Sequence, residues 1–178
     1  RTGDLFAYRR IGVAPDVMSL AKALGGGFPI GACLATAEAA SGMTPGSHGS
    51  TFGGNPLAVA AAHAVLDVML APGFFERTQK MSLLLKQKLA SVVDRYPDVL
   101  SEVRGEGLLI GLKAVVPSGD LVSALREEKL LTVGAGENVV RLLPPLIIGE
   151  AEINEAAQRL ERACVRLSGA SANKEAAQ

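Results

Sequence analysis

A single lysine stands at the end of a short apolar run, just before three consecutive glycines. The run covers residues 17–23, and the glycines occupy positions 25–27. An apolar run closed by glycines is typical of a buried strand that feeds a tight turn. The lysine there, Lys22, is expected to be desolvated, which favours the neutral, nucleophilic amine that forms Schiff bases. From the residues alone, an ordinary surface lysine at a strand end is the alternative.

A loop of small and hydroxylated residues follows at positions 46–54. Its centre is Gly49, Ser50 and Thr51, whose backbone N–H and hydroxyl groups suit a phosphate. The loop leads into an Asn-Pro pair, which is typical of the start of a helix. The sequence therefore predicts a phosphate contact here, with a plain loop that caps the helix as the alternative.

A third candidate is Arg141, which lies in an otherwise aliphatic run at positions 139–143. An arginine flanked by aliphatic residues is expected on a strand, and its planar guanidinium can bind a carboxylate through two parallel hydrogen bonds. A structural ion pair is the alternative use of the same side chain.

Composition narrows the class of protein. The 178 residues are 48% hydrophobic but only 4% aromatic, with no Trp, so the core is expected to be aliphatic. Equal numbers of basic and acidic residues, 18 of each, argue against nucleic acid as a partner. No apolar run reaches the length of a membrane span, and the His and Cys residues have no metal-ligand spacing. Cys33 and Cys164 lie in apolar stretches, which fits the reducing cytoplasm.

Hydrophobic periodicity predicts alternating strands and helices, with residues 1–16 as loop. Strands are expected at 17–23, 30–36, 99–103, 108–116, 130–133 and 139–143, a helical turn at 37–41, and helices at 55–70, 74–96, 120–128 and 150–167. The helix at 55–70 is apolar almost all round and is therefore expected to be buried.

We place a domain boundary near Pro72. Residues 1–72 read as part of a large α/β layer, residues 73–168 as a small α/β domain, and residues 169–178 as a disordered tail. The first residues read as the middle of a domain, without a signal peptide, so we expect the natural protein to begin further upstream.

Several segments together resemble one enzyme family, the class III (ω-type) aminotransferases that use pyridoxal 5′-phosphate (PLP). The resemblance covers nearly the whole chain up to about position 167 and is closest to the acetylornithine group. It rests on RTGDLFAY at the start, AKALGGGFPIGA at 21–32, GSHGSTFGGNPLA at 46–58, VRGEGLLIGL at 103–112 and NVVRLLPPLII at 138–148.

The resemblance implies a fold-type I α/β structure, comprising the C-terminal part of the PLP-binding large domain and the C-terminal small domain. It implies that Lys22 holds PLP as a Schiff base and shuttles the proton of the substrate Cα. Gly49 and Ser50 would contact the cofactor phosphate. Thr51 would reach the PLP phosphate of the neighbouring subunit, which implies a homodimer. Arg141 would bind the α-carboxylate of the substrate.

The implied reaction moves an amino group between N-acetylornithine and 2-oxoglutarate in arginine biosynthesis. Ornithine, succinylornithine, succinyl-diaminopimelate and 4-aminobutyrate remain open as donors, as do an aminomutase, a decarboxylase and a non-catalytic truncated module. The glycines at 25–27 match neither nucleotide-binding motif. The Asp that meets the ring nitrogen, the stacking aromatic and a second phosphate loop would precede Arg1, so this chain alone is expected not to bind PLP tightly.

Overall fold

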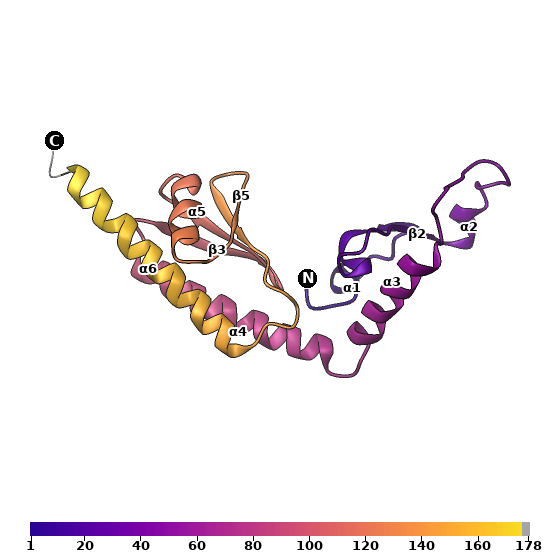
Figure 1. The fold of residues 1–178 in the computed structure, drawn as a ribbon, viewed down its shortest axis with the longest axis horizontal. Coiled ribbons are helices and arrows are strands. Elements are labelled where there is room, and N and C mark those ends of the chain that lie inside the picture. Colours follow the sequence, from indigo (N-terminus) through magenta and orange to yellow (C-terminus); the bar gives the residue numbers. More distant parts are fainter. Residues whose placement is uncertain (176–178) are drawn as a thin grey trace. The chain divides into compact units, whose positions relative to one another are not determined.

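The computed structural model describes the backbone of residues 1–175 and the side chains of residues 1–169. Two compact units make up the chain (Figure 1). The N-terminal unit is Asp4–Phe75, and the C-terminal unit is Arg1–Gly3 together with Glu76–Gln178. The first three residues join the C-terminal unit because the amide of Leu108 donates to the Arg1 carbonyl at 2.8 Å and Gln79 Nε2 donates to the Gly3 carbonyl at 2.7 Å.

The C-terminal unit is a four-stranded sheet with three helices. The strands are antiparallel in the order β3-β4-β6-β5, and the helices are α4, α5 and α6 (Figure 1). Their bounds are β3 Leu100–Glu106, β4 Leu109–Ala114, β5 Val133–Ala135, β6 Val139–Leu142, α4 Phe74–Arg95, α5 Ser118–Glu127 and α6 Glu150–Glu175. The aliphatic side chains of one sheet face form a single buried cluster with residues of all three helices. The other face, here called the open face, carries exposed side chains such as Arg104 and Arg141.

The core is aliphatic, as the composition predicted. Helix α4 contributes Met81, Leu85, Leu89 and Val92, which recur at helical spacing and are at most 5% exposed. Alternate positions of β4 and β6 face them, because successive side chains of a strand point to opposite faces. Burial of this set is the main favourable contribution to the stability of the unit.

Two glycines of the β3–β4 hairpin allow a close approach of backbone segments. Gly105 has φ +116° and Gly107 has φ +58°, a region that favours glycine. A Cβ at Gly105 would collide with the Leu109 carbonyl, and one at Gly107 would collide with the backbone of Arg1 and Thr2. The spacing Gly-Glu-Gly in this hairpin therefore has a steric cause.

The N-terminal unit contains a two-stranded antiparallel sheet and short helices. Its elements are α1 Tyr8–Ile11, β1 Val17–Leu20, the 3-10 helix η1 Lys22–Gly25, β2 Ala32–Ala35, α2 Ala37–Ala40 and α3 Pro56–Met69. The start of α3 is as predicted: the Asn55 side chain accepts a hydrogen bond from the Ala58 amide at 2.9 Å, and proline occupies the first turn.

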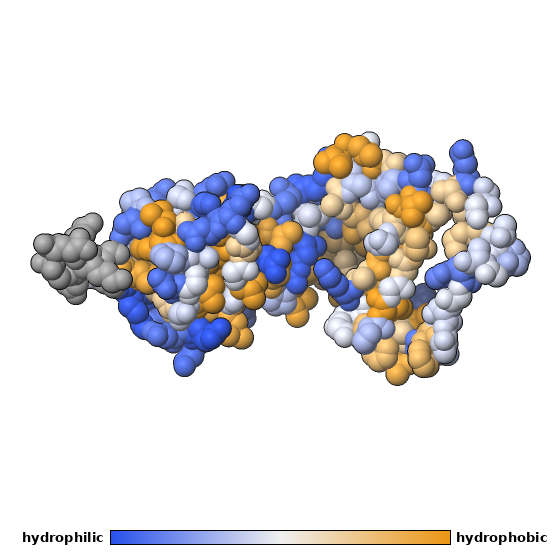
Figure 2. All heavy atoms as spheres, turned by 90° about the horizontal axis from the view of Figure 1, so that it is seen from above, coloured by the Kyte–Doolittle hydropathy of each residue, from blue (hydrophilic) through white to orange (hydrophobic). Residues whose placement is uncertain are grey.

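Burial in the N-terminal unit differs from the prediction. Helix α3 was expected to be buried, but only Ala58 and Ala62 are, and Leu57 is 67% exposed. Figure 2 shows hydrophobic side chains spread over the surface of this unit. The helix is apolar on several faces, and the neighbours within the unit cover only one of them. Strand β1 is likewise exposed or half-buried along its length, so the predicted buried strand is wrong for this chain.

The other predicted elements are present with shifted bounds, and one short helix was not predicted. Residues 8–11 form α1 where loop was expected, and β5 lies at Val133–Ala135 instead of 130–133. Helix α6 continues to Glu175, past the predicted end at position 167, since the added residues include good helix formers such as Ala, Lys and Glu. The rest of the predicted tail, residues 176–178, lies outside the described part of the chain. Across the described residues, no single helix has the length and apolarity to span a membrane, although α3 and α4 pass that test when counted together across their break.

Candidate cofactor and carboxylate sites

Lys22 is the first residue of η1 and has an unusual backbone conformation. Its φ is +53°, in the left-handed region that few non-glycine residues adopt. The residue is exposed, so the desolvation predicted from a buried strand does not occur in this chain. Among the described residues, no hydrogen bond or ion pair holds its amine. Lys22 therefore presents an unengaged ammonium or amine group from a constrained backbone.

The glycines after Lys22 let η1 pack closely against its neighbours. A Cβ at Gly25 would lie 2.8 Å from Ile30 Cγ2, and one at Gly26 would lie 2.8 Å from Val65 Cγ2 on α3. Gly26 also has φ +62°, which a side chain would strain. The glycines thus allow the turn that follows the lysine to pack closely against Ile30, just before β2, and against α3.

The loop before α3 borders a cavity of about 450 Å³. Ser50, Gly53, Gly54 and Asn55 line it, and residues 29–32 form another part of its wall. Within the described chain, the backbone N–H groups of residues 49–54 donate to no protein acceptor. Free amides, a hydroxyl and the first turn of a helix are the donors that hold a phosphate in proteins. This loop therefore fits a phosphate group.

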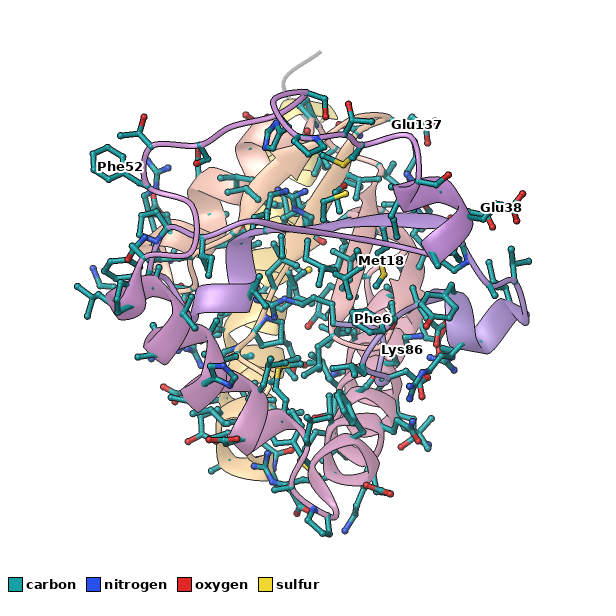
Figure 3. The ribbon with its side chains drawn as sticks, turned by 90° about the vertical axis from the view of Figure 1, so that its right-hand side faces the viewer. Phe6, Met18, Glu38, Phe52, Lys86 and Glu137 are labelled. Atoms are coloured by element: carbon teal, nitrogen blue, oxygen red, sulfur yellow. The ribbon has the colours of Figure 1, made fainter. Side chains whose placement is uncertain are left out.

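The two neighbours of Ser50 lie outside the cavity that Ser50 lines. Gly49 and Thr51 are exposed and do not line the cavity. The ring of Phe52 is 80% exposed and extends from the loop (Figure 3). The loop is therefore tied at its end, where Asn55 Nδ2 donates to the Phe52 carbonyl at 3.0 Å, while its tip is open.

Arg141 lies on β6, as predicted, and on the open face of the C-terminal sheet. It pairs with Gly111 of β4 on one side and with Val133 of β5 on the other. It is exposed, and within residues 1–169 its guanidinium makes no hydrogen bond or ion pair. The structural ion pair considered as an alternative is thus absent from the described chain, and the side chain is free to bind an external carboxylate.

Three other charged residues share this open face. Arg104 of β3 also pairs with Gly111, and its Nη2 lies 2.9 Å from a carboxylate oxygen of Glu137. The hydrogen bond from Arg104, its charge and the charge of Lys113 hold the pKa of Glu137 below its usual value. Arg104 is therefore engaged, whereas its neighbour across the glycine, Arg141, is not.

Sequence reasoning missed Arg104, Glu137 and Asn138. Arg104 lies in the quoted segment at 103–112, and strand alternation there would have placed it on the same face as Arg141. Glu137 and Asn138 both have left-handed backbones, with φ of +58° and +57°, in the turn just before β6. Asn in a glycine-containing turn was the available signal.

The candidate residues fall into both units. Lys22, Gly49, Ser50 and Thr51 belong to the N-terminal unit, and Arg141 belongs to the C-terminal unit. The N-terminal unit presents an exposed amine and a loop with unpaired backbone amides, and the C-terminal unit presents an exposed guanidinium.

Comparison with known proteins defines the class. Residues 1–164 match the class-III aminotransferases, so the chain belongs to that family. Acetylornithine aminotransferase 1 of Bradyrhizobium diazoefficiens is 81% identical over 168 residues, which are 94% of this chain and 42% of the relative. The acetylornithine aminotransferase of Brucella melitensis is 62% identical over the same shares of both chains.

Solved structures agree with this assignment. The acetylornithine aminotransferase of Elizabethkingia anophelis superposes with a TM-score of 0.86 at 37% identity, over 93% of this chain and 45% of that one. The ornithine aminotransferase of Toxoplasma gondii gives a TM-score of 0.88 at 32% identity, over 95% of this chain and 41% of that one. The predicted α/β fold of a C-terminal portion of fold-type I aminotransferases is confirmed. The chain spans less than half the length of these relatives.

Proposed function

We propose that this chain supplies part of the active site of a PLP-dependent aminotransferase that acts on N-acetylornithine or a similar ω-amino donor and on 2-oxoglutarate. The observation that carries the proposal is the exposed, unengaged Lys22 in a left-handed conformation, within a chain that belongs to the class-III family. Residues in sparsely populated backbone conformations cluster at active sites and ligand-binding sites.

PLP, when bound, supplies an electron sink for the carbanion left when the substrate Cα loses its proton. Lys22 would hold the cofactor through its Nζ, and the same amine would take up and return the proton of the substrate Cα. The exposure of Lys22 in this chain means that the groups that dehydrate the amine must come from outside the described residues of its own unit.

Ser50 and the free amides of its loop bind the phosphate of the cofactor. Gly49 lets the backbone approach the anion closely. Thr51, which is exposed beside the cavity, reaches the phosphate held by a second copy, so the active protein is a homodimer. Class-III membership supports this arrangement.

Arg141 binds the α-carboxylate of the amino-acid or oxo-acid substrate in the bidentate geometry of its guanidinium. This clamp orients the Cα–H bond that is broken and leaves the proton transfer to the lysine. The acetylornithine aminotransferases among the relatives support N-acetylornithine as donor, and with it a role in arginine biosynthesis in the cytoplasm.

The experiment is a chimera in which this chain replaces the matching 168-residue segment of the Bradyrhizobium relative, with which it shares 81% of residues. We expect the chimera to bind PLP, turn yellow and transfer the amino group of N-acetylornithine to 2-oxoglutarate. Lys22→Ala should abolish both the colour and the reaction. Lys129→Ala is the matched control, since Lys129 is also an exposed lysine with a left-handed backbone, φ +63°. A chimera that binds PLP equally well without Lys22 would refute the proposal.

A further inference from the structure

We propose that Asn138 is a positioning residue that fixes the strand carrying Arg141 and thereby sets how tightly the protein holds carboxylate substrates. The inference rests on the proposed role of Arg141 and extends it to a residue that makes no contact with substrate. It starts from the hydrogen bonds of one half-buried amide in the turn before β6.

Asn138 ties this turn to the connection between β4 and α5. Its Oδ1 accepts a hydrogen bond from the Ser118 amide at 2.7 Å, and its Nδ2 donates to the carbonyls of Ala114 at 2.7 Å and Val116 at 2.8 Å. Its own carbonyl accepts from the Ala114 amide at 3.0 Å. One half-buried side chain thus makes hydrogen bonds to three backbone groups of this connection.

Glu137 adds a second tie, to the open face of the sheet. Its carboxylate is bound by Arg104 of β3, and its carbonyl accepts a hydrogen bond from Lys113 Nζ of β4. The turn before β6 is therefore bound to both β3 and β4. Both turn residues adopt left-handed conformations, with φ of +58° for Glu137 and +57° for Asn138.

These ties determine where Arg141 points. Asn138 directly precedes β6, and Arg141 is the third residue of that strand. Successive side chains of a strand alternate between faces, so a slip of one residue would move Arg141 from the open face into the aliphatic core. Val140 and Leu142 are buried in that core on either side of it, which shows that the present register is the one that exposes the guanidinium.

The position opposite Arg141 is occupied by the smallest residue. Gly111 pairs with Arg141 on one side and with Arg104 on the other. A Cβ at Gly111 would lie 2.9 Å from Val139 Cγ1 and 3.5 Å from Arg104 Cγ. The surface between the two arginines is therefore backbone, and the direction of the Arg141 side chain depends on how β6 is held at its start.

The test uses the chimera and compares Asn138→Gly with Lys129→Gly. Glycine accepts the left-handed backbone at both positions, so the first change removes mainly the side-chain hydrogen bonds. We expect Asn138→Gly to raise the KM for 2-oxoglutarate about 10-fold, equivalent to about 1.4 kcal/mol. The yellow colour of the bound cofactor and the kcat should change by less than about 2-fold, and Lys129→Gly should leave the KM unchanged.

A double-mutant cycle shows whether Asn138 acts through Arg141. In the Arg141→Met background, Asn138→Gly should have no further effect on the KM, because the group that it positions is gone. An additive effect, or an equal rise of the KM for an amine substrate that has no carboxylate, would overturn the proposal. If Asn138→Gly does not fold, Glu137→Gln loosens the same turn at an exposed site, and an unchanged KM in that variant would also count against it.

The parent chimera separates this inference from the proposed function. A parent that neither turns yellow nor transfers amino groups would refute the proposed function before any Asn138 variant is made. A fully active parent whose Asn138→Gly variant keeps the parent KM would refute the positioning role alone.

Discussion

Replacing Arg141 with Met tests the carboxylate clamp without disturbing the fold. Arg141 is exposed and makes no hydrogen bond or ion pair within residues 1–169, so its removal leaves no orphaned partner. Exposed substitutions of this kind change the free energy of unfolding by about 0.5 kcal/mol or less. The only expected loss is therefore in substrate binding.

The size of that loss follows from the bonds removed. Hydrogen bonds to a charged partner contribute about 1.5–3 kcal/mol, which corresponds to a rise of about 10- to 150-fold in the KM for 2-oxoglutarate. Arg141→Lys keeps the charge but loses the parallel pair of donors, so its KM should lie between those of the parent and the Met variant.

The assay is steady-state transamination by the chimera over a range of 2-oxoglutarate concentrations, together with urea unfolding of each variant. Arg126→Met is the matched control, because Arg126 is also exposed and makes no ion pair within the described chain. A parent-like KM in Arg141→Met, or an equal rise in both Met variants, would refute the clamp.

Three further predictions concern the reactivity of the two thiols and the packing of the C-terminal unit. Burial raises the pKa of Cys164 to about 12, so at pH 8 it should stay a thiol and not react with a disulfide reagent, while exposed Cys33 reacts; labelling of Cys164 before unfolding would contradict this. Leu89→Ala should lower the free energy of unfolding in urea by about 3–5 kcal/mol, because Leu89 is 0% exposed. Leu83 on the same helix is 60% exposed, so Leu83→Ala should lower it by less than about 1 kcal/mol. Gly107→Ala should lower the free energy of unfolding by about 2 kcal/mol or more, because of backbone strain and a collision with Arg1 and Thr2. An unchanged free energy of unfolding in the same urea assay would contradict this prediction.

Local patterns predicted much of the C-terminal unit. The apolar residues of α4 recur at helical spacing and are buried, together with alternate residues of β4 and β6. The predicted apolar faces match the observed burial because this unit contains the segments that cover them. Arg141 could be placed on a strand in advance because aliphatic residues flank it on both sides. The turn before β6 could not be predicted in detail, since its left-handed residues are held by contacts to distant segments at Ser118 and Arg104.

The N-terminal unit shows the limit of the same reasoning. The apolar character of β1 and α3 predicted burial, but burial depends on what packs against a segment, and the unit itself covers little of either. The N-cap of α3 was predictable because it is a local contact between Asn55 and Ala58. The left-handed conformation of Lys22, φ +53°, was not predictable, because lysine has no preference for that region.

The most direct measurement is to reduce the PLP-loaded chimera with borohydride and map the labelled peptide by mass spectrometry. The cofactor should be found on the Nζ of Lys22, with one equivalent per chain. A label on any other lysine, with Lys22 unmodified, would contradict the assignment of the lysine on which the proposed reaction depends.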